Sequence, residues 1–167
     1  MANSYSGNRI IVIGCPGSGK STLAIRLHER TALPVVHLDN IWWKADRTHI
    51  TQEEFDQKLA EALYKDRWII DGDYSRTYEM RFHCCDTVIF LDYSKETCMS
   101  GITARVGKQR PDIPWTESAL DTELVKLVQS YRQENRPQIL RLMEKYPQKQ
   151  YFVFHTREEA DIWLESL

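Results

Sequence analysis

The chain has 167 residues, of which 28% are charged, and a formal net charge of −2 at pH 7. This length suits one domain with a single core, and the near-neutral charge excludes a global basic field for holding nucleic acid. No apolar run approaches the roughly 18 residues of a membrane-spanning helix, and the first eight residues are polar. We therefore expect a loose tail over 1–8, one domain over 9–167 and a cytosolic protein with no membrane partner.

The first predicted element is a buried strand over residues 9–13, an apolar run bounded by polar residues. Short apolar runs of this kind are typical of strands that are covered on both faces. Similar runs predict further strands over 35–38, 68–70, 87–91 and 151–155. Helical patterns alternate with these runs, so the sequence predicts an α/β fold of three layers, with a five-stranded parallel sheet between helices.

A phosphate loop follows the first strand directly. Residues 14–21 read Gly-Cys-Pro-Gly-Ser-Gly-Lys-Ser, a full match to the Walker A pattern G-x-x-x-x-G-K-[ST] in its required strand–loop–helix context. The loop amides and the helix N-terminus attract phosphates, Lys20 reaches the outer phosphates, and Ser21 offers a hydroxyl to Mg²⁺. No Asn-Lys-x-Asp guanine-reading motif is present, which favours ATP. The predicted nucleotide-binding residues are Gly14, Cys15, Pro16, Gly17, Ser18, Gly19, Lys20, Ser21 and Thr22.

The predicted helices are recognised by their caps and apolar stripes. Thr51 and Glu54 form a capping-box pattern, and so do Thr156 and Glu159. Another helix is expected after Ser94. A long helix is predicted from about Thr116, continuing from Pro137, with an apolar stripe of Leu120, Leu124, Leu127, Val128 and Tyr131.

Carboxylates follow three of the predicted strands, at the sheet edge where ligands of open α/β sheets bind, and two of them are candidate site residues. Asp71 closes the third strand and is predicted to hold Mg²⁺, directly or through water, as a Walker B acid does. The alternative is a cap on the following turn. Asp39 follows the second strand, where it would bind an acceptor hydroxyl or take its proton. Its alternative is a helix cap or loop residue.

A basic segment after the fourth strand is predicted to close over the nucleotide. Residues 105–110 contain Arg105, Lys108 and Arg110 around a glycine. We expect a lid over about 105–116 that brings Arg105 and Arg110 to the transferring phosphoryl group. Surface charge without a function is the alternative.

The acceptor side is predicted from residues near the second and third strands. Arg76 and Arg81 would clamp an anionic acceptor, and Trp42 and Trp43 would stack on a ring or pack in the core. Together with Tyr74, the candidate acceptor-binding residues are Asp39, Trp43, Tyr74, Arg76 and Arg81.

The order of these motifs resembles the small P-loop kinases known as DNA topology modulation proteins, which are relatives of adenylate kinase. The matching segments are the phosphate loop, His37-Leu38-Asp39, Trp43-Lys44, 68–72, 86–92 and Arg110-Pro111-Asp112. The resemblance implies strands in the order 2-3-1-4-5, ATP and Mg²⁺ at 14–21, Asp71 near the metal, and lid arginines at 105 and 110. Where adenylate kinase has Asp-Gly-Phe-Pro-Arg, this chain has Asp71-Gly72-Asp73-Tyr74-Ser75, which disfavours the usual AMP site.

The sequence therefore predicts an ATP- and Mg²⁺-dependent phosphotransferase acting on a small-molecule acceptor, with nucleotides and nucleosides as candidates. A metabolite kinase of the shikimate or gluconate type is an alternative within this class. A regulatory switch that binds and hydrolyses ATP without a small acceptor is the rival. A sugar or alcohol acceptor would require Asp39, whereas a phosphate-bearing acceptor would require Arg76 and Arg81. Direct nucleic-acid binding is not expected, because no basic stripe or DNA-reading module is present.

Overall fold

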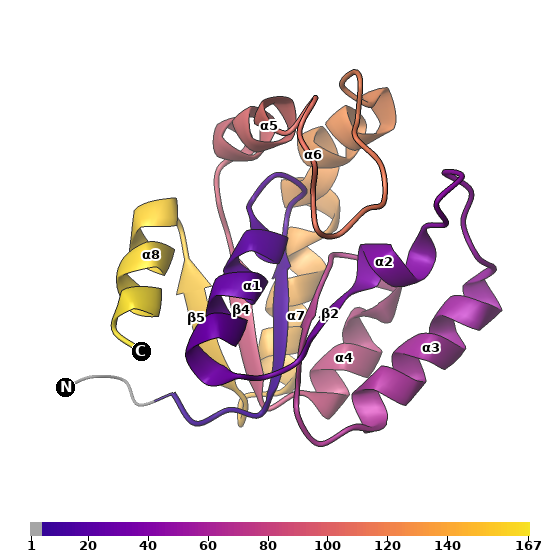
Figure 1. The fold of residues 1–167 in the computed structure, drawn as a ribbon. Helices are drawn as coiled ribbons and strands as arrows, with labels where there is room; N and C mark the ends of the chain where they lie inside the picture. The colour runs from indigo at the N-terminus through magenta and orange to yellow at the C-terminus, as the bar shows by residue number, and fades with distance from the viewer. Residues whose placement is uncertain (1–4) are drawn as a thin grey trace.

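The computed structural model describes residues 5–167, and its centre is a five-stranded parallel sheet (Figure 1). The strand order is β2-β3-β1-β4-β5, which confirms the predicted fold class and order. The strands are β1 (Arg9–Gly14), β2 (Val35–His37), β3 (Trp68–Asp71), β4 (Thr87–Leu91) and β5 (Gln150–Phe154).

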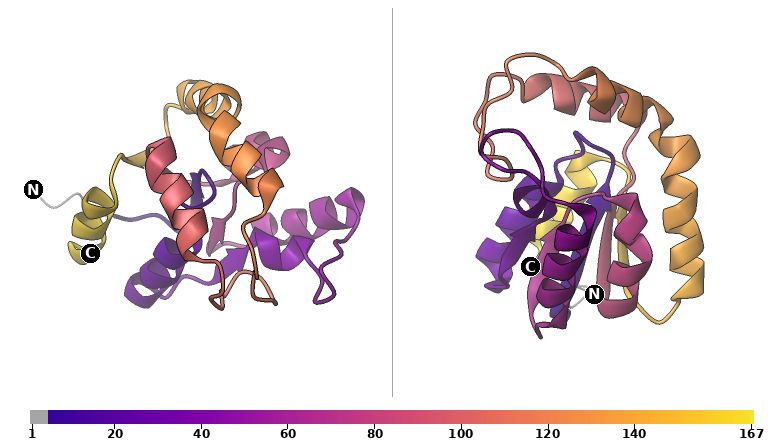
Figure 2. Two further views of the ribbon diagram at one scale, coloured as in Figure 1. Left: turned by 90° about the horizontal axis from the view of Figure 1, so that it is seen from above. Right: turned by 90° about the vertical axis from the view of Figure 1, so that its right-hand side faces the viewer.

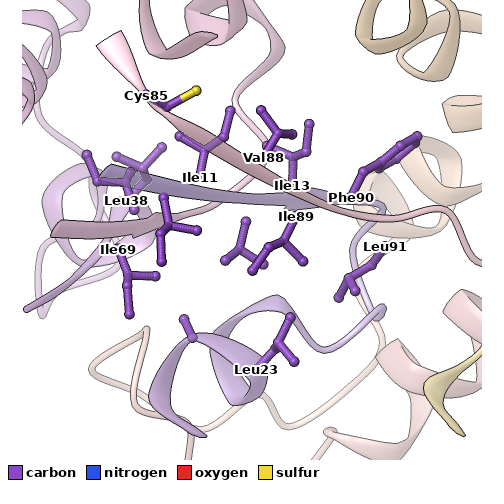
Figure 3. Packing of buried hydrophobic residues seen from close by; sticks show 14 of the residues in the cluster. Ile11, Ile13, Leu23, Leu38, Ile69, Cys85, Val88, Ile89, Phe90 and Leu91 are labelled. Atoms are coloured by element: carbon purple, nitrogen blue, oxygen red, sulfur yellow. The ribbon is translucent and has the colours of Figure 1, made fainter. Parts of the chain in front are cut away.

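The sheet is buried because its central strands carry apolar side chains on both faces. Ile11 on β1 pairs in register with Val88 on β4, and all residues from Ile10 to Ile13 are fully buried. Figure 3 shows Ile11 and Val88 on one side of the strands, with Ile89 on the other side toward Leu23. Strands that alternate in this way need a helical layer on each face.

Two helical layers cover the sheet (Figure 2). Helices α1 (Lys20–Thr31) and α8 (Arg157–Glu165) lie on one face, and α4 (Tyr78–Cys84) and α7 (Arg136–Lys145) lie on the other. Helix α3 (Gln52–Tyr64) packs against the short α2 (Leu38–Trp42). The capping box of α3 is present, because Thr51 and Glu54 bond to each other's backbone amides. At α8 half of the predicted box is present, because the Thr156 hydroxyl accepts from the amide of Glu159 (3.2 Å), whereas the Glu159 carboxylate accepts from the amide of His155 (2.7 Å).

The remaining elements lie above the carboxyl ends of the strands (Figure 1). A short 3₁₀ helix, η1 (Ser75–Thr77), follows β3, and α5 (Lys95–Ala104) follows β4. The connecting loop (105–121) runs from α5 to α6 (Thr122–Glu134), and it arches over this end of the sheet (Figure 2). The fold thus places the connecting loop above the phosphate loop and the ends of β2 and β3.

Three sequence predictions of elements are corrected by the structure. The long helix begins at Thr122 instead of Thr116, because the Asp121 carboxylate accepts from the amide of Glu123 (2.9 Å) and caps it there. Leu120 therefore lies outside the apolar stripe and is 36% exposed. The second strand ends at His37, so Asp39 lies in the first turn of α2. Helices α2 and α4 were not predicted, since five and seven residues are too few to show a helical period.

The predicted loose tail is described only from Tyr5 onward, and residues 1–4 lie outside the described part of the chain. The Tyr5 ring lies 6.4 Å from that of Trp163 on α8, and the amide of Asn8 donates to Asp86 Oδ2 (2.9 Å). Within residues 5–167, none of the helices has the length and apolar character that crossing a membrane requires.

Candidate active site

The phosphate loop curls between β1 and α1 through left-handed backbone conformations. Gly17 and Gly19 have φ angles of 84° and 92°, which side chains other than glycine rarely adopt. The amide of Ser18 donates to the Cys15 carbonyl (3.1 Å). The Ser18 hydroxyl is buried and has no hydrogen-bond partner among the described residues. A loop of this shape, with an unpartnered hydroxyl, fits a bound anion.

Two helices hold this loop from outside. On α5, Gly101 lies directly against the backbone of Gly17. On α8, the Arg157 guanidinium donates to the carbonyls of Ser18 (3.0 Å) and Gly17 (2.8 Å). The sequence analysis missed Arg157. The feature that could have identified Arg157 is its place at the start of α8. A cation is unfavourable at a helix N-terminus, so an arginine there indicates a contact elsewhere.

The candidate ligands for a metal ion lie at the same end of the sheet as the phosphate loop. Ser21 is in the first turn of α1, and Asp71 ends β3 with a carboxylate that is 3% exposed. His37 Nδ1 is bonded to Asp71 Oδ2 (2.7 Å). Burial opposes the charged form of His37, but the hydrogen bond and charge of Asp71 outweigh it, so the pKa of His37 is raised. A hydroxyl and a carboxylate are hard oxygen ligands, and they fit Mg²⁺, which keeps most of its waters.

One cavity of about 1090 Å³ joins the phosphate loop to the predicted acceptor side. Lys20 reaches back across the loop, where its ammonium donates to the Cys15 carbonyl (3.1 Å). The predicted site residues that line this cavity are Pro16, Gly17, Gly19, Lys20, Ser21, Thr22, Asp39, Trp43, Asp71, Tyr74, Arg105 and Arg110. The structure thus brings the residues of the phosphate loop, α2 and the connecting loop to one space.

Asp39 lines the same cavity and is held there by Tyr74. The Tyr74 hydroxyl donates to Asp39 Oδ1 (2.5 Å), and the Tyr74 ring stacks on Phe55 with centroids 5.0 Å apart. Burial raises the pKa of Asp39 to about 6, and the negative charge of Asp112 adds to the effect. A carboxylate with a pKa in this range is a suitable proton acceptor near neutral pH.

The two predicted lid arginines are paired with carboxylates of the connecting loop. Arg110 donates to Asp112 Oδ2 (2.5 Å) and to Glu117 Oε2 (3.4 Å). Arg105 Nε lies 3.8 Å from Glu117, and burial lowers the pKa of Arg105. In the described residues, both arginines therefore face acids of their own segment.

The connecting loop touches α2 and the residues after it. The Asn40 side chain donates to the Pro111 carbonyl (3.2 Å). The Trp115 ring meets the Trp43 ring edge to face, with centroids 5.4 Å apart, and the Arg47 guanidinium lies 5.7 Å above the Trp115 ring. The sequence analysis did not single out Arg47 or Trp115, since contacts between two irregular loops leave no periodic signal.

Two predicted acceptor residues lie outside the cavity. Arg76 forms a bidentate pair with Asp56 on α3 (2.6 and 3.0 Å) at the surface. Arg81 is fully buried and donates to the carbonyls of Gly72 (2.9 Å) and Asp73. Neither side chain lines the cavity. Both guanidinium groups have protein partners in the structure. That they clamp an anionic acceptor stays a prediction.

Asp73 is a half-buried carboxylate whose partners come from α4, α6 and the residue that joins α6 to α7. Its Oδ1 accepts from the hydroxyls of Tyr78 on α4 and Tyr131 on α6 (2.9 Å for Tyr131), and its Oδ2 accepts from the Asn135 amide (3.0 Å). Burial raises the pKa of Asp73. Because Asn135 joins α6 to α7, this carboxylate fixes the end of β3 against the helices behind it.

The parallel sheet in this order, with a phosphate loop between its first strand and first helix, defines a P-loop nucleotide-binding fold. Among solved structures, the chain is similar to shikimate kinase from Bacteroides thetaiotaomicron, with 17% identity, coverage of 96% of both chains and a TM-score of 0.58. It is also similar to an unliganded sugar kinase from Janibacter sp., with 18% identity, coverage of 96% of this chain and 91% of the other, and a TM-score of 0.55. No protein-family model and no curated protein matches the chain. At these identities, the likeness shows the fold.

Proposed function

We propose that this protein is an ATP- and Mg²⁺-dependent phosphotransferase that acts on a hydroxyl group of a small molecule. The observation that carries the proposal is the shared cavity, which is lined by Lys20 and Ser21 of the phosphate loop and also by Asp39. The likeness of the fold to proteins named as shikimate kinase and sugar kinase supports a kinase. The topology modulation proteins that this sequence resembles are themselves small P-loop kinases, so the resemblance supports the same proposal.

The donor half binds and orients the triphosphate. The loop amides surround its phosphates, and Lys20 moves its ammonium from the Cys15 carbonyl to the outer phosphate oxygens. Ser21 and Asp71 would hold Mg²⁺, the latter through water, and bound Mg²⁺ neutralises charge on the phosphates. Arg105 and Arg110 exchange their carboxylate partner Glu117 for the transferring group, whose charge they stabilise.

The acceptor half orients the hydroxyl and takes its proton. The hydroxyl oxygen forms a bond to the γ-phosphorus, the bond from that phosphorus to the bridging oxygen of ADP breaks, and the proton passes to Asp39. Arg76 and Arg81 do not line the cavity, so the arrangement favours an alcohol, a sugar or a nucleoside over a nucleoside monophosphate. This supports the metabolite-kinase alternative over an adenylate kinase.

The test is ADP release from Mg-ATP with sugars, nucleosides, nucleoside monophosphates, amino alcohols and hydroxy acids as acceptors. We expect stimulation by a hydroxyl-bearing class, reduced on the order of 100-fold or more in Lys20→Ala, which removes charge stabilisation of the transferring group. Lys58→Ala, at an exposed site on α3, is the matched control and keeps full activity. Slow release that is indifferent to every acceptor would contradict the proposal and favour the nucleotide-driven switch.

A further inference from the structure

The Asp71 carboxylate at the end of β3 has two oxygens in different surroundings. Its Oδ2 accepts from His37 Nδ1 (2.7 Å). Its Oδ1 accepts from no donor of residues 5–167, yet it is not one of the enclosed polar atoms that lack a partner, so solvent reaches it. Asp71 lines the cavity, and its carboxylate is 3% exposed. The carboxylate is therefore held through Oδ2 and open to the cavity through Oδ1.

The sheet places His37 directly beside Asp71. The two residues are partners in the register of the parallel strands β2 and β3, so their side chains lie on the same face. On its other side Asp71 pairs with Val12 of β1, which is apolar and fully buried. Ile69, two residues before Asp71, lies on the side of the sheet toward Leu23 of α1 (Figure 3), and Asp71 shares that side. His37 is thus the neighbour in the sheet that offers Asp71 a donor.

Asp71 and Ser21 come from neighbouring elements on this side of the sheet. Ser21 lies in the first turn of α1, and both residues line the cavity. His37 does not line it, and its side chain is 11% exposed. His37 therefore touches the candidate metal ligand without being part of the cavity wall, so its effect on a bound nucleotide would pass through Asp71.

A role in folding alone does not explain this arrangement. The backbone ladder over Val35–His37 already aligns β2 with β3. A carboxylate that serves only the fold has both oxygens paired, because a buried polar atom without a partner is costly. Asp73 is such a group, since its Oδ1 accepts from Tyr131 and its Oδ2 from Asn135. Asp71 is more deeply buried than Asp73, yet its second oxygen is left to the cavity.

We propose that His37 is a positioning residue of the metal site, which holds Asp71 Oδ2 and thereby presents Oδ1 to the hydrated Mg²⁺ of Mg-ATP. This inference rests on the proposed function, because it concerns the nucleotide half of the same site. Without the bond to His37, the carboxylate can rotate about its Cβ–Cγ bond and turn Oδ1 away from the cavity. Removing a partner that orients a metal-binding group typically weakens metal binding about 10- to 100-fold.

The test separates the metal-dependent part of nucleotide binding from the rest. Titration calorimetry gives the affinity for AMP-PNP, an ATP analogue with an imido group between its β- and γ-phosphates, once with Mg²⁺ and once with EDTA. The readout is the ratio of the two affinities, to which the binding of Mg²⁺ by the analogue itself contributes equally in every variant. His37→Phe removes the donor and should lower this ratio about tenfold or more, while the affinity in EDTA stays unchanged.

Two amide variants and one control locate the effect in a single hydrogen bond. His37→Asn should keep most of the ratio, because the amide nitrogen of Asn and Nδ1 of His are both attached to Cγ. His37→Gln carries its amide one bond further from the backbone and should lower the ratio as His37→Phe does. His28→Phe is the matched control, since His28 Nδ1 donates to the Leu33 carbonyl (2.7 Å) in the last turn of α1, and it should leave the ratio intact.

The outcomes distinguish the inference from the function on which it rests. In an Asp71→Asn background, His37→Phe should lower the ratio no further, because the two residues act as a unit. An unchanged ratio in His37→Phe, or equal losses with Mg²⁺ and with EDTA, would overturn the inference and leave the kinase standing. A ratio that depends on His37, without transfer to any acceptor, would uphold the inference and overturn the phosphotransferase. Should His37→Phe fail to fold, equal ratios in His37→Asn and His37→Gln would overturn the inference instead.

Discussion

Gly101 on α5 lies so close to Gly17 of the phosphate loop that a Cβ atom at position 101 would stand 1.9 Å from the Gly17 carbonyl oxygen. A Cβ atom at Gly17 would in turn stand 2.1 Å from the Cys98 carbonyl oxygen of the same helix. Two backbones therefore touch without side chains between them. The position of α5 and the shape of the phosphate loop are consequently linked.

Gly101→Ala should destabilise the protein and weaken ATP binding, because α5 or the loop must move to admit the methyl group. We expect a loss of about 1–3 kcal/mol in the free energy of unfolding, as for other overpacked sites. In an exposed helix the same change would stabilise by about 1 kcal/mol. The sign of the change in unfolding free energy therefore distinguishes a close backbone contact from an exposed helical site. Chemical denaturation and the affinity for a fluorescent ATP analogue measure both effects. Ser100→Ala, exposed on the same helix, is the control, and a more stable Gly101→Ala with unchanged ATP affinity would refute the link.

Arg157→Met should weaken ATP binding with little change in stability. Arg157 is exposed and holds the loop through the Ser18 and Gly17 carbonyls, so its loss frees the loop without opening the core. Hydrogen bonds to charged groups contribute about 1.5–3 kcal/mol, which corresponds to a weakening of about tenfold or more. Titration calorimetry with Mg-ATP measures it. Arg141→Met, at another exposed position, should bind as the unaltered protein does, and equal affinities in both variants would count against the role of Arg157.

The phosphate loop was predictable because it depends on a local pattern, whereas the strand order was implied by the resemblance to the small P-loop kinases. An apolar run followed by a glycine-rich turn and a helix specifies β1, the loop and α1 without information from the rest of the chain. Asp39 and Asp71 could be placed at one edge because parallel strands end at the same side of a sheet. The roles of these carboxylates stay predictions.

The acceptor side was less predictable because it depends on tertiary contacts. Nothing near Arg81 in the sequence indicates that its guanidinium is buried among the carbonyls after β3. Asp112 and Trp115 lie in the connecting loop, which has no periodicity, and this loop contacts α2 and Trp43 about 70 residues earlier in the sequence. The apolar residues near Leu120 resembled a helical stripe, but the Asp121 cap stops the helix short of them.

Arg81→Met and Arg76→Met should separate folding from acceptor binding. Arg81 serves backbone carbonyls in the core, so its loss should cost about 3–5 kcal/mol of unfolding free energy, since each unsatisfied buried group costs about 1–3 kcal/mol. Arg76 pairs with Asp56 at a surface where its side chain is 45% exposed, and such pairs contribute about 0–1 kcal/mol. Urea denaturation measures both. A rise in the acceptor KM in Arg76→Met, with stability unchanged, would restore Arg76 to the acceptor site.

The rate of transfer should rise with pH through the pKa of Asp39. The carboxyl group must be ionised to take the hydroxyl proton, and its pKa is raised to about 6, mainly by burial and further by Asp112. The kcat/KM for the acceptor should therefore increase toward pH 6 and level off above it. In Asp112→Asn the midpoint should move to lower pH, because one negative neighbour is lost. A pH profile that is identical in the two proteins would exclude Asp39 as the group that titrates.

Asp39→Asn should abolish most transfer yet make the protein more stable at neutral pH. The pKa of Asp39 is about 6 in the folded state against 3.8 for the ordinary side chain, so between these values the folded state binds more protons than the unfolded state. The unaltered protein therefore loses stability as pH rises from about 4 to about 6, by about 2 kcal/mol for a shift of this size. Asn has no proton to lose, and its oxygen still accepts from Tyr74. Denaturation at pH 4 and pH 7.5 should show similar stabilities at the lower pH and an advantage for Asp39→Asn at the higher one. An advantage of equal size at both would mean that packing, and not the charge of Asp39, is responsible.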